Sequence, residues 1–494
     1  MRRKMPIFYS ALMLTGVNLL LRLVGTSFQV YISGRIGAAG VGLLQLVMSV
    51  GMLAMTAGMA GVRTTAIYLT AEELGRKQPG NVIWVLSGCF LYSILCSGIL
   101  SCGLYTLAPY LAEHLVGDVR TLGAIRLYAG FLPITCLCGV MTGYFTAAGR
   151  IGTLAAVEVA EQLFSMVVTV LALTFWAGSD PTKACQAVVL GGGVSGCVTL
   201  CALAALRLLE RQKAAPRIPI RRRLLQCAVP LAVADVTKSG ISTTENLMVP
   251  KRLALYPGTD DPLAAFGTVC GMVFPVLMFP AAILYGLAEL LIPELARCAA
   301  VGSQQRIRYL ARRSLRVAMV YGCVFCGAMF LLSDTLCMAL YGSVEAGMHL
   351  RRFSLLIPML YCDAITDAMT KGLGQQKICV RYNILTSVLD VVFLYFLLPR
   401  YGMDGYFISF LVTHLLNFLL SLHLLVKISG ITVSLWTPLA AIAATAVGIG
   451  AASLLANAVL GCIACILIMG ALLFLGKVLH REDITWLFGL VRKK

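Results

Sequence analysis

Long apolar runs of about 20 residues, separated by short polar segments, recur along almost the whole chain. A helix of about 20 apolar residues crosses the hydrocarbon core of a bilayer and satisfies its own backbone hydrogen bonds. The sequence does not show the short alternating strands of a transmembrane barrel. The runs therefore predict an all-α polytopic membrane protein.

Composition points the same way, because 59% of the 494 residues are hydrophobic and only 13% are charged. Soluble proteins carry about 25% charged residues. The first apolar run continues to about Val30, whereas a cleaved signal peptide has an apolar region of roughly 7–15 residues. We expect this run to be retained as the first span.

The apolar runs predict fourteen spans. They cover about residues 7–30, 41–60, 82–107, 127–145, 154–176, 187–206, 224–249, 263–291, 315–332, 353–369, 378–397, 406–426, 435–456 and 459–478. We expect an N-terminal six-helix lobe in residues 1–210, a basic cytoplasmic linker in 211–223 and a C-terminal six-helix lobe in 224–428. Two additional helices in 432–480 and a cytoplasmic interfacial tail in 481–494 follow.

Lys and Arg are distributed asymmetrically between the two sides of the predicted membrane. With both termini in the cytoplasm, the inner segments hold 28 of the 40 Lys and Arg residues and the outer segments eight, and four lie within or at the edge of spans. This is the pattern of the positive-inside rule. It predicts a multi-pass protein of the bacterial cytoplasmic membrane with both termini inside. It also accounts for the net charge of +18 without a nucleic-acid partner.

No motif in the sequence predicts an enzyme. The GGGVSG run at Gly191–Gly196 lies inside a span without a preceding strand, which favours close helix packing over dinucleotide binding. The two CxxC pairs, Cys323 with Cys326 and Cys462 with Cys465, lie in apolar spans without histidine or acidic partners. We therefore expect no catalytic residue, no metal and no cofactor.

The segment of residues 221–253 is the most unusual span. It opens with three arginines and then carries Asp235, Lys238 and Glu245 at spacings of three and seven, with Ser242 between them. On a helix these positions fall on one stripe. Ionisable side chains at membrane depth usually face the interior of a bundle or a wet cavity. This stripe is therefore a candidate wall of a transport pathway.

Five segments of the chain resemble a known family. They are LLRLVGTSFQVYISGRIGAAGVGLLQL at Leu20–Leu46, GTLAAVEVAEQLFSMVV at Gly152–Val168, TTENLMVPKRL at Thr243–Leu253, the run Gly267–Ala296, and DAMTKGLGQQKI at Asp367–Ile378. Their order and the fourteen expected spans resemble the stage V sporulation protein B-like branch of the multidrug/oligosaccharidyl-lipid/polysaccharide (MOP) exporter superfamily.

The resemblance implies a MATE/MOP-like fold, with two lobes around a central cavity that opens by alternating access. It also implies transport of a polyprenyl-linked glycan precursor, and for the sporulation members a link to spore cortex peptidoglycan. A coupling cation, Na⁺ or H⁺, belongs to the same expectation.

Arg22 and Lys238 are the candidate contacts to a substrate diphosphate. A guanidinium binds phosphate oxygens bidentately, and Lys238 supplies a point charge. The structural alternative for Arg22 is a bond to helix carbonyls or extension toward the interface. For Lys238 it is a neutralising pair with Asp235 or Glu245; Glu245 is itself a candidate substrate contact.

Three further residues are candidate substrate contacts. Glu161 and Gln162 match the acidic or amide position of the family, where they would pair with Arg22 or bind sugar hydroxyls. Asn246 is a substrate contact or an interhelical hydrogen bond. Related lipid II flippases carry more than one arginine in the first span, and Phe28 stands where the second is expected here.

The candidate coupling and gating residues are acidic, with one lysine. Asp363, Asp367 and Lys371 recur every four residues, which predicts a gating or helix-packing stripe. Asp390 is a candidate proton or cation site in the eleventh span. Asp235 belongs to this group as well.

Three functions remain open at this point. The first is a flippase for a polyprenyl-diphosphate-linked glycan precursor, with the bilayer and a lipid-linked oligosaccharide as partners. The second is a sodium- or proton-coupled exporter of cationic drugs. That branch typically has twelve spans and an acid in the first span, whereas this chain has fourteen expected spans and Arg22. The third is a non-transporting scaffold for envelope synthesis.

Overall fold

The computed structural model describes residues 7–76, 78–178, 180–209, 220–432, 436–455 and 457–476. Within these residues every regular element is a helix, so the all-α fold class is confirmed. Most of the predicted linker 211–223 and the whole predicted tail 481–494 lie outside the described residues. The contacts divide the chain into two compact units, Met1–Gly267 and Thr268–Lys494.

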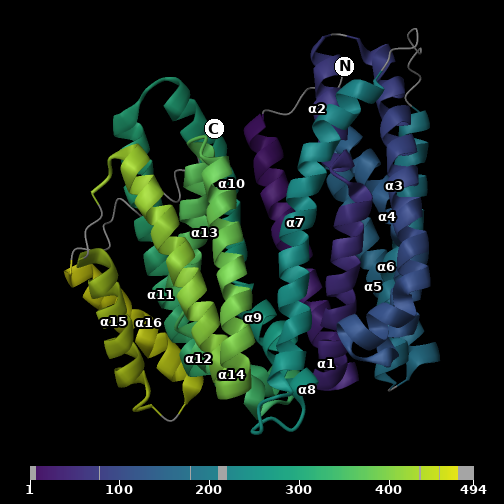
Figure 1. Ribbon diagram of the computed structural model, residues 1–494. Helices are drawn as coiled ribbons and strands as arrows, with labels where there is room; N and C mark the ends of the chain where they lie inside the picture. The colour runs from purple at the N-terminus through teal and green to yellow at the C-terminus, as the bar shows by residue number, and fades with distance from the viewer. Residues whose placement is uncertain are drawn as a thin grey trace. The chain divides into compact units, whose positions relative to one another are not determined.

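The N-terminal unit is built from helices that pack side by side along their lengths (Figure 1). They are α1 (Ile7–Met59), α2 (Val62–Gly75), α3 (Val82–Tyr110), α4 (Leu122–Ala147), α5 (Ile151–Ala172), α6 (Pro181–Leu208), α7 (Arg221–Leu253) and the short α8 (Pro262–Phe266). One cluster of its buried core is made by apolar residues of α2, α3, α4 and α7, with single contributions from α5 and α6, and α1 adds further buried residues such as Leu43 and Val47.

The C-terminal unit is also a helical bundle (Figure 1). Its helices are α9 (Phe274–Met278), α10 (Ala281–Ala300), α11 (Gln304–Tyr341), α12 (Val344–Ser354), α13 (Ile357–Gly372), α14 (Gln376–Ser429), α15 (Trp436–Ala452) and α16 (Ala458–Leu475). The last two helices pack against each other and against α11.

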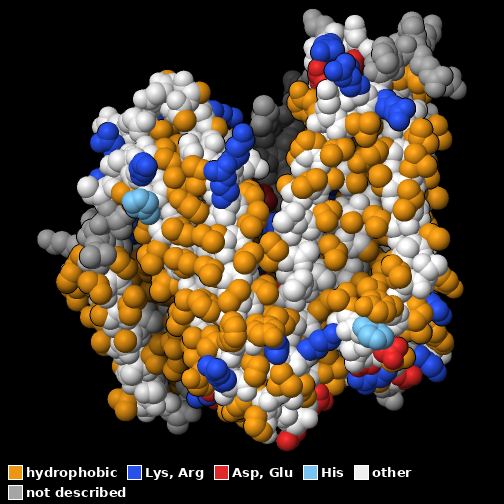
Figure 2. All heavy atoms as spheres, viewed as in Figure 1, with side chains coloured by type: hydrophobic (Ala, Val, Ile, Leu, Met, Phe, Trp, Pro, Cys, Tyr) orange, Lys and Arg blue, Asp and Glu red, His pale blue; other side chains and the backbone are white. Residues whose placement is uncertain are grey.

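The chain is a multi-pass membrane protein. In the described ranges, nine helical segments are long and apolar enough to cross a membrane, and a bent pair that contains α10 raises the number to ten. Two of these segments contain a break at a left-handed glycine, Gly37 (φ 68°) in α1 and Gly402 (φ 56°) in α14. Hydrophobic side chains cover the flanks of the helices in each unit, as Figure 2 shows. The total of fourteen spans stays a prediction.

A two-residue break separates α1 from α2 and brings α7 against the backbone. Ala60 and Gly61 both have a positive φ, 42° and 70°. A Cβ on Gly61 would lie 2.6 Å from the Ala228 carbonyl oxygen and 2.9 Å from the Leu231 Cβ. Since no side chain fits there, glycine is what allows α7 to pack directly onto the break.

The beginning of α7 is anchored in the N-terminal unit by apolar packing and by charge. Leu224 and Ala228 are buried in the core of this unit. Arg223 forms ion pairs with Glu72 (2.6 Å) and with Glu73 (2.9 Å), whose side chain is only 1% exposed. The contacts thus group α7 with the N-terminal unit, whereas the sequence places it at the start of the second lobe. The division into lobes stays a prediction.

Replacing Gly61 by alanine is expected to destabilise the protein. The new Cβ would force α7 away from the break and would meet a left-handed backbone, together costing about 1–3 kcal/mol. Gly75 in α2 is the matched control, because a Cβ there meets nothing within 4 Å. Thermal unfolding in detergent should show a lower midpoint for Gly61→Ala and an unchanged or higher midpoint for Gly75→Ala. Equal midpoints for the two variants would contradict the packing described for Gly61.

Candidate functional site

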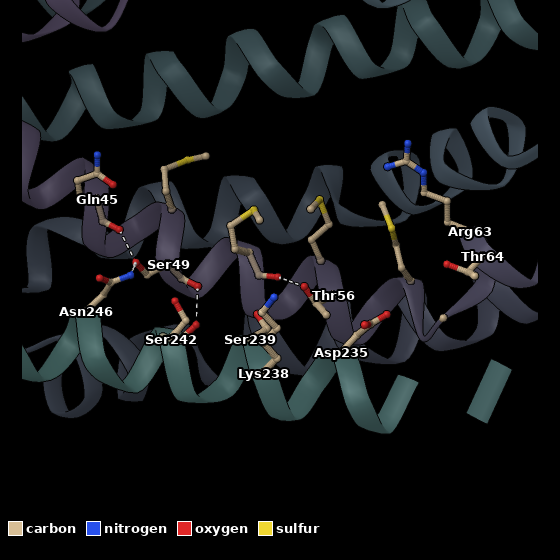
Figure 3. A pocket seen from close by; sticks show the side chains of 16 residues that line it. Gln45, Ser49, Thr56, Arg63, Thr64, Asp235, Lys238, Ser239, Ser242 and Asn246 are labelled. Carbon is tan, nitrogen blue, oxygen red and sulfur yellow. Dashed lines mark hydrogen bonds between the residues drawn. The ribbon is translucent and has the colours of Figure 1, made fainter. Parts of the chain in front are cut away.

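A cavity of about 540 Å³ lies among residues of α1, α2 and α7 (Figure 3). The α7 wall includes Asp235, Lys238, Ser242 and Asn246. These residues are spaced by three or four positions and therefore share one face of the helix. Glu245 is not among the residues that line this cavity. Of the stripe predicted from the sequence, Asp235, Lys238 and Ser242 thus line the cavity. The fourth member, Glu245, does not, and its neighbour Asn246 lines the cavity instead.

Methionines form much of the opposite wall. Met48, Met52, Met55 and Met59 recur along α1 at spacings of four, three and four, so they face the cavity as one stripe. Methionine is flexible and polarisable and adapts to irregular shapes. The cavity therefore combines a polar wall on α7 with an adaptable apolar wall on α1.

Hydrogen bonds join the two walls at one end of the cavity. The Asn246 amide donates to the Ser49 hydroxyl (3.0 Å), and the Thr243 hydroxyl donates to the Ser49 carbonyl oxygen (3.1 Å). The Ser49 hydroxyl in turn donates to the carbonyl of Gln45 (2.8 Å). Asn246 thus makes the interhelical hydrogen bond that the sequence left as one of two alternatives.

The charged side chains lie away from this hydrogen-bonded end. Figure 3 shows Asp235 between Lys238 and Arg63 along the cavity. Asp235 and Lys238 are both exposed. Two cations against one carboxylate give these charged lining residues a positive balance, which favours an anionic ligand.

Arg63 is a cavity residue that the sequence shows only as a cation at the edge of the second predicted span. It lies in the first turn of α2, directly after the Ala60–Gly61 break. The break determines where this turn faces, and the sequence marks it only by an isolated glycine inside an apolar run. This isolated glycine was therefore visible in the sequence, but on its own it did not place Arg63 at the site.

Arg22, Glu161 and Gln162 lie elsewhere in the N-terminal unit, and none of these three described residues lines the 540 Å³ cavity. Arg22 is half-buried on α1. A Cβ on Gly25, one turn further on, would lie 3.9 Å from the Gln162 amide nitrogen on α5. The carbonyl of Glu161 accepts a hydrogen bond from Ser195 on α6 (3.1 Å). The structure therefore brings Gln162 close to the turn that follows Arg22, while their roles in binding stay predictions.

Asp390 lies in a polar cluster inside the C-terminal unit. Its side chain is 8% exposed and accepts hydrogen bonds from the hydroxyls of Ser409 (2.6 Å) and Thr413 (3.1 Å). Both hydroxyls lie on α14 beyond the break at Gly402. The cluster thus joins the two halves of α14 through a buried carboxyl group.

The predicted stripe of Asp363, Asp367 and Lys371 divides into two contacts. The Asn417 amide lies 3.1 and 3.3 Å from the two carboxylate oxygens of Asp363 and donates to them. Asp367 and Lys371 form an ion pair with each other (2.5 Å). Asp363 therefore belongs with the α14 cluster, because Asn417 follows Thr413 by one turn, and Asp367 and Lys371 do not share its hydrogen bonds.

Comparison with solved structures defines the fold class. No protein-family model matches the chain. An inward-facing MATE family transporter of the MOP superfamily superposes with a TM-score of 0.67, at 16% identity over 84% of this chain and 98% of that one. The lipid II flippase MurJ, in an inward closed conformation, gives a TM-score of 0.71 at 12% identity over 96% of this chain and 100% of that one. The chain has the fold of the MOP superfamily transporters.

Its sequence is similar to that of stage V sporulation protein B of Bacillus subtilis (strain 168). The two chains are 22% identical over 416 residues, which is 80% of this chain and 79% of that protein. The resemblance seen in the sequence is thereby confirmed.

Proposed function

We propose that this chain is a flippase that moves a polyprenyl-diphosphate-linked glycan precursor across the cytoplasmic membrane by alternating access. The observation that carries the proposal is the cavity in which Lys238 and Arg63 flank Asp235. A positively charged cavity attracts a diphosphate, and ionised hydrogen bonds to phosphate are strong. The similarity to stage V sporulation protein B and the MurJ-like fold support the same class of substrate.

Each group in the cavity has a distinct task in this proposal. Arg63 binds one phosphate bidentately through its planar guanidinium, and Lys238 holds the other as a point charge. Asp235, Ser239 and Ser242 offer acceptors and donors to the hydroxyls of the glycan. The methionines on α1 adapt to the sugar and any attached peptide.

The charge of the cavity disfavours the alternative of a cation-drug exporter. Such an exporter needs carboxylates that outnumber the cations in its binding site, whereas Asp235 is outnumbered by Lys238 and Arg63. The similarity of this chain to the MATE transporters is a similarity of fold and does not by itself support drug export. A non-transporting scaffold would have no use for ionisable groups that are costly to keep at membrane depth.

Ion coupling is proposed for the polar cluster of the C-terminal unit. Asp390, held by Ser409 and Thr413, is a buried carboxyl group that can take up H⁺ or, with the two hydroxyl oxygens, coordinate Na⁺. Asn417 lies one turn beyond Thr413 on α14 and donates to Asp363 on α13, so this pair would sense the charge of Asp390. Uptake of the cation would change which packing of the two halves of α14 is favoured.

The proposal places the protein in the bacterial cytoplasmic membrane with both termini in the cytoplasm. The excess of Lys and Arg in the predicted inner segments supports this orientation. The partners are then the bilayer and the lipid-linked oligosaccharide, with no nucleic acid. The chain would move its substrate without forming or breaking a covalent bond, in synthesis of the spore cortex or of the vegetative envelope.

The proposal is tested by flipping of a fluorescent polyprenyl-diphosphate-linked glycan in liposomes. Lys238→Gln and Arg63→Gln should each reduce the rate about tenfold or more, because each removes an ionic hydrogen bond to phosphate. Lys183→Gln on α6 is the matched control, since Lys183 is an exposed cation that does not line the cavity. Wild-type rates in both cavity variants would overturn the assignment of the cavity to the diphosphate.

Arg22 gives a separate prediction, because a cation near the bilayer centre costs about 2.5–3.5 kcal/mol on insertion scales. If a visiting anion offsets that cost, Arg22→Ala should insert normally and lose transport, and Arg22→Lys should recover it only in part. If Arg22 is structural, Arg22→Ala should lower thermal stability. Transport should then return when Glu161→Gln or Glu245→Gln is added. Stability and flipping measured on the same preparations separate the two roles.

Asp390→Asn should abolish the response of transport to an imposed Na⁺ or H⁺ gradient, because the amide cannot carry the negative charge that binds the cation. Asp404→Asn is the control, since Asp404 is an exposed partner of Arg352 in the same unit. A gradient response that persists in Asp390→Asn would move the coupling site away from this cluster.

A further inference from the structure

Three arginines form a stripe on the first turns of α11. Arg308, Arg312 and Arg316 are spaced by four residues, so they lie one above another on one face of the helix. Arg308 and Arg312 are exposed, and Arg316 is half-buried. Arg306 lies on a different face and is paired with Glu294 (2.5 Å). No acidic residue occurs in the sequence between positions 304 and 333, so α11 itself supplies no countercharge for the stripe.

The same face of α11 continues as the wall of an apolar cavity. Met319, Cys323, Cys326 and Phe330 follow Arg316 at spacings of three or four residues and line a cavity of about 710 Å³. The other walls come from α13, α14 and α15. Thr445 is the one hydroxyl among the lining residues, and it donates to the carbonyl of Ala441 (2.8 Å). The cavity therefore suits hydrocarbon.

The arginine stripe and the cavity meet at the start of α15. Arg312 donates a hydrogen bond to the Thr432 hydroxyl (2.8 Å), four residues before the helix begins at Trp436. Trp436 is 63% exposed, and Pro438, two residues later, lines the cavity. Tryptophan and arginine are both typical of the level of the lipid headgroups. α11 and α15 are in direct contact.

We propose that this face of the C-terminal unit binds one anionic phospholipid, with the phosphate on Arg308, Arg312 and Arg316 and an acyl chain in the 710 Å³ cavity. The charge of the stripe selects an anionic headgroup. Met319 and Phe330 are separated by about 16 Å along α11, at 1.5 Å per residue. This is about half of the 30 Å hydrocarbon core, the depth that the acyl chain of one leaflet reaches.

The length of the cavity along α11 also distinguishes a phospholipid acyl chain from the polyprenyl chain of the proposed substrate. A polyprenyl chain is much longer than one leaflet, and the cations proposed to bind its diphosphate, Lys238 and Arg63, line a different cavity in the N-terminal unit. The phospholipid site is therefore independent of the proposed function. It holds whether or not the chain is a flippase.

Native mass spectrometry of the purified full chain tests the headgroup contact. With phosphatidylglycerol and phosphatidylcholine of identical chains, the wild type should retain one phosphatidylglycerol and bind phosphatidylcholine at least about tenfold more weakly. Combining Arg308→Gln, Arg312→Gln and Arg316→Gln should weaken phosphatidylglycerol binding by about tenfold or more. Arg221→Gln with Arg222→Gln, two exposed arginines of α7, is the matched control and should change nothing.

The tail contact has its own pair of variants, which keeps the test decisive if the triple variant fails to fold. Gly450 lines the cavity and Gly470 on α16 does not, and a Cβ at either position meets nothing within 4 Å. Gly450→Phe should fill the cavity and reduce phosphatidylglycerol binding, whereas Gly470→Phe should not. Equal binding of the two phospholipids, no loss in Gly450→Phe, or displacement of phosphatidylglycerol by equimolar polyprenyl phosphate would overturn the proposal.

Discussion

The packing of α7 on the break between α1 and α2 is the contact on which the candidate substrate site depends. At one end Gly61 lets the backbone of α7 approach to a distance that no side chain would allow. At the other end Ser49 and Asn246 join α1 to α7 by a hydrogen bond. The cavity occupies the turns between these two anchors, and Arg223 with Glu73 ties the start of α7 to α2. A change at either anchor would therefore alter the shape of the cavity without touching its charges.

Charged groups inside an apolar bundle need a reason, because burying them opposes insertion and folding. In the N-terminal unit Lys238, Arg63 and Asp235 line an open cavity, and a ligand is the reason that we propose for them. In the C-terminal unit Asp390 and Asp363 are satisfied by hydroxyl and amide donors instead. The two units thus treat charge differently. We propose that the charge of the N-terminal unit serves a substrate and that of the C-terminal unit a small cation.

The sequence predicts the fold class and part of the site, because apolar run length and helical spacing are local properties. They placed Asp235, Lys238 and Ser242 on one face, and the five resembling segments indicated the superfamily. The sequence did not predict Arg63 as a site residue, because the direction in which its side chain points depends on the left-handed turn at Ala60–Gly61. The rotation of α7 about its axis decides whether Glu245 or Asn246 lines the cavity. The hydrogen-bond partner of Asp363 is Asn417, which lies 54 residues away in the sequence. Spacing along one helix does not encode such contacts. The assignment of α7 to a lobe depends on tertiary packing in the same way.

The most direct test of the central claim is to locate the bound substrate in the protein. A photoreactive polyprenyl diphosphate, with the reactive group next to the phosphates, would be crosslinked to the purified chain in liposomes and mapped by peptide mass spectrometry. We expect labelling of the cavity walls, on residues 45–64 of α1 and α2 and residues 235–246 of α7, with competition by unlabelled probe. Saturable labelling confined to the C-terminal unit would contradict it.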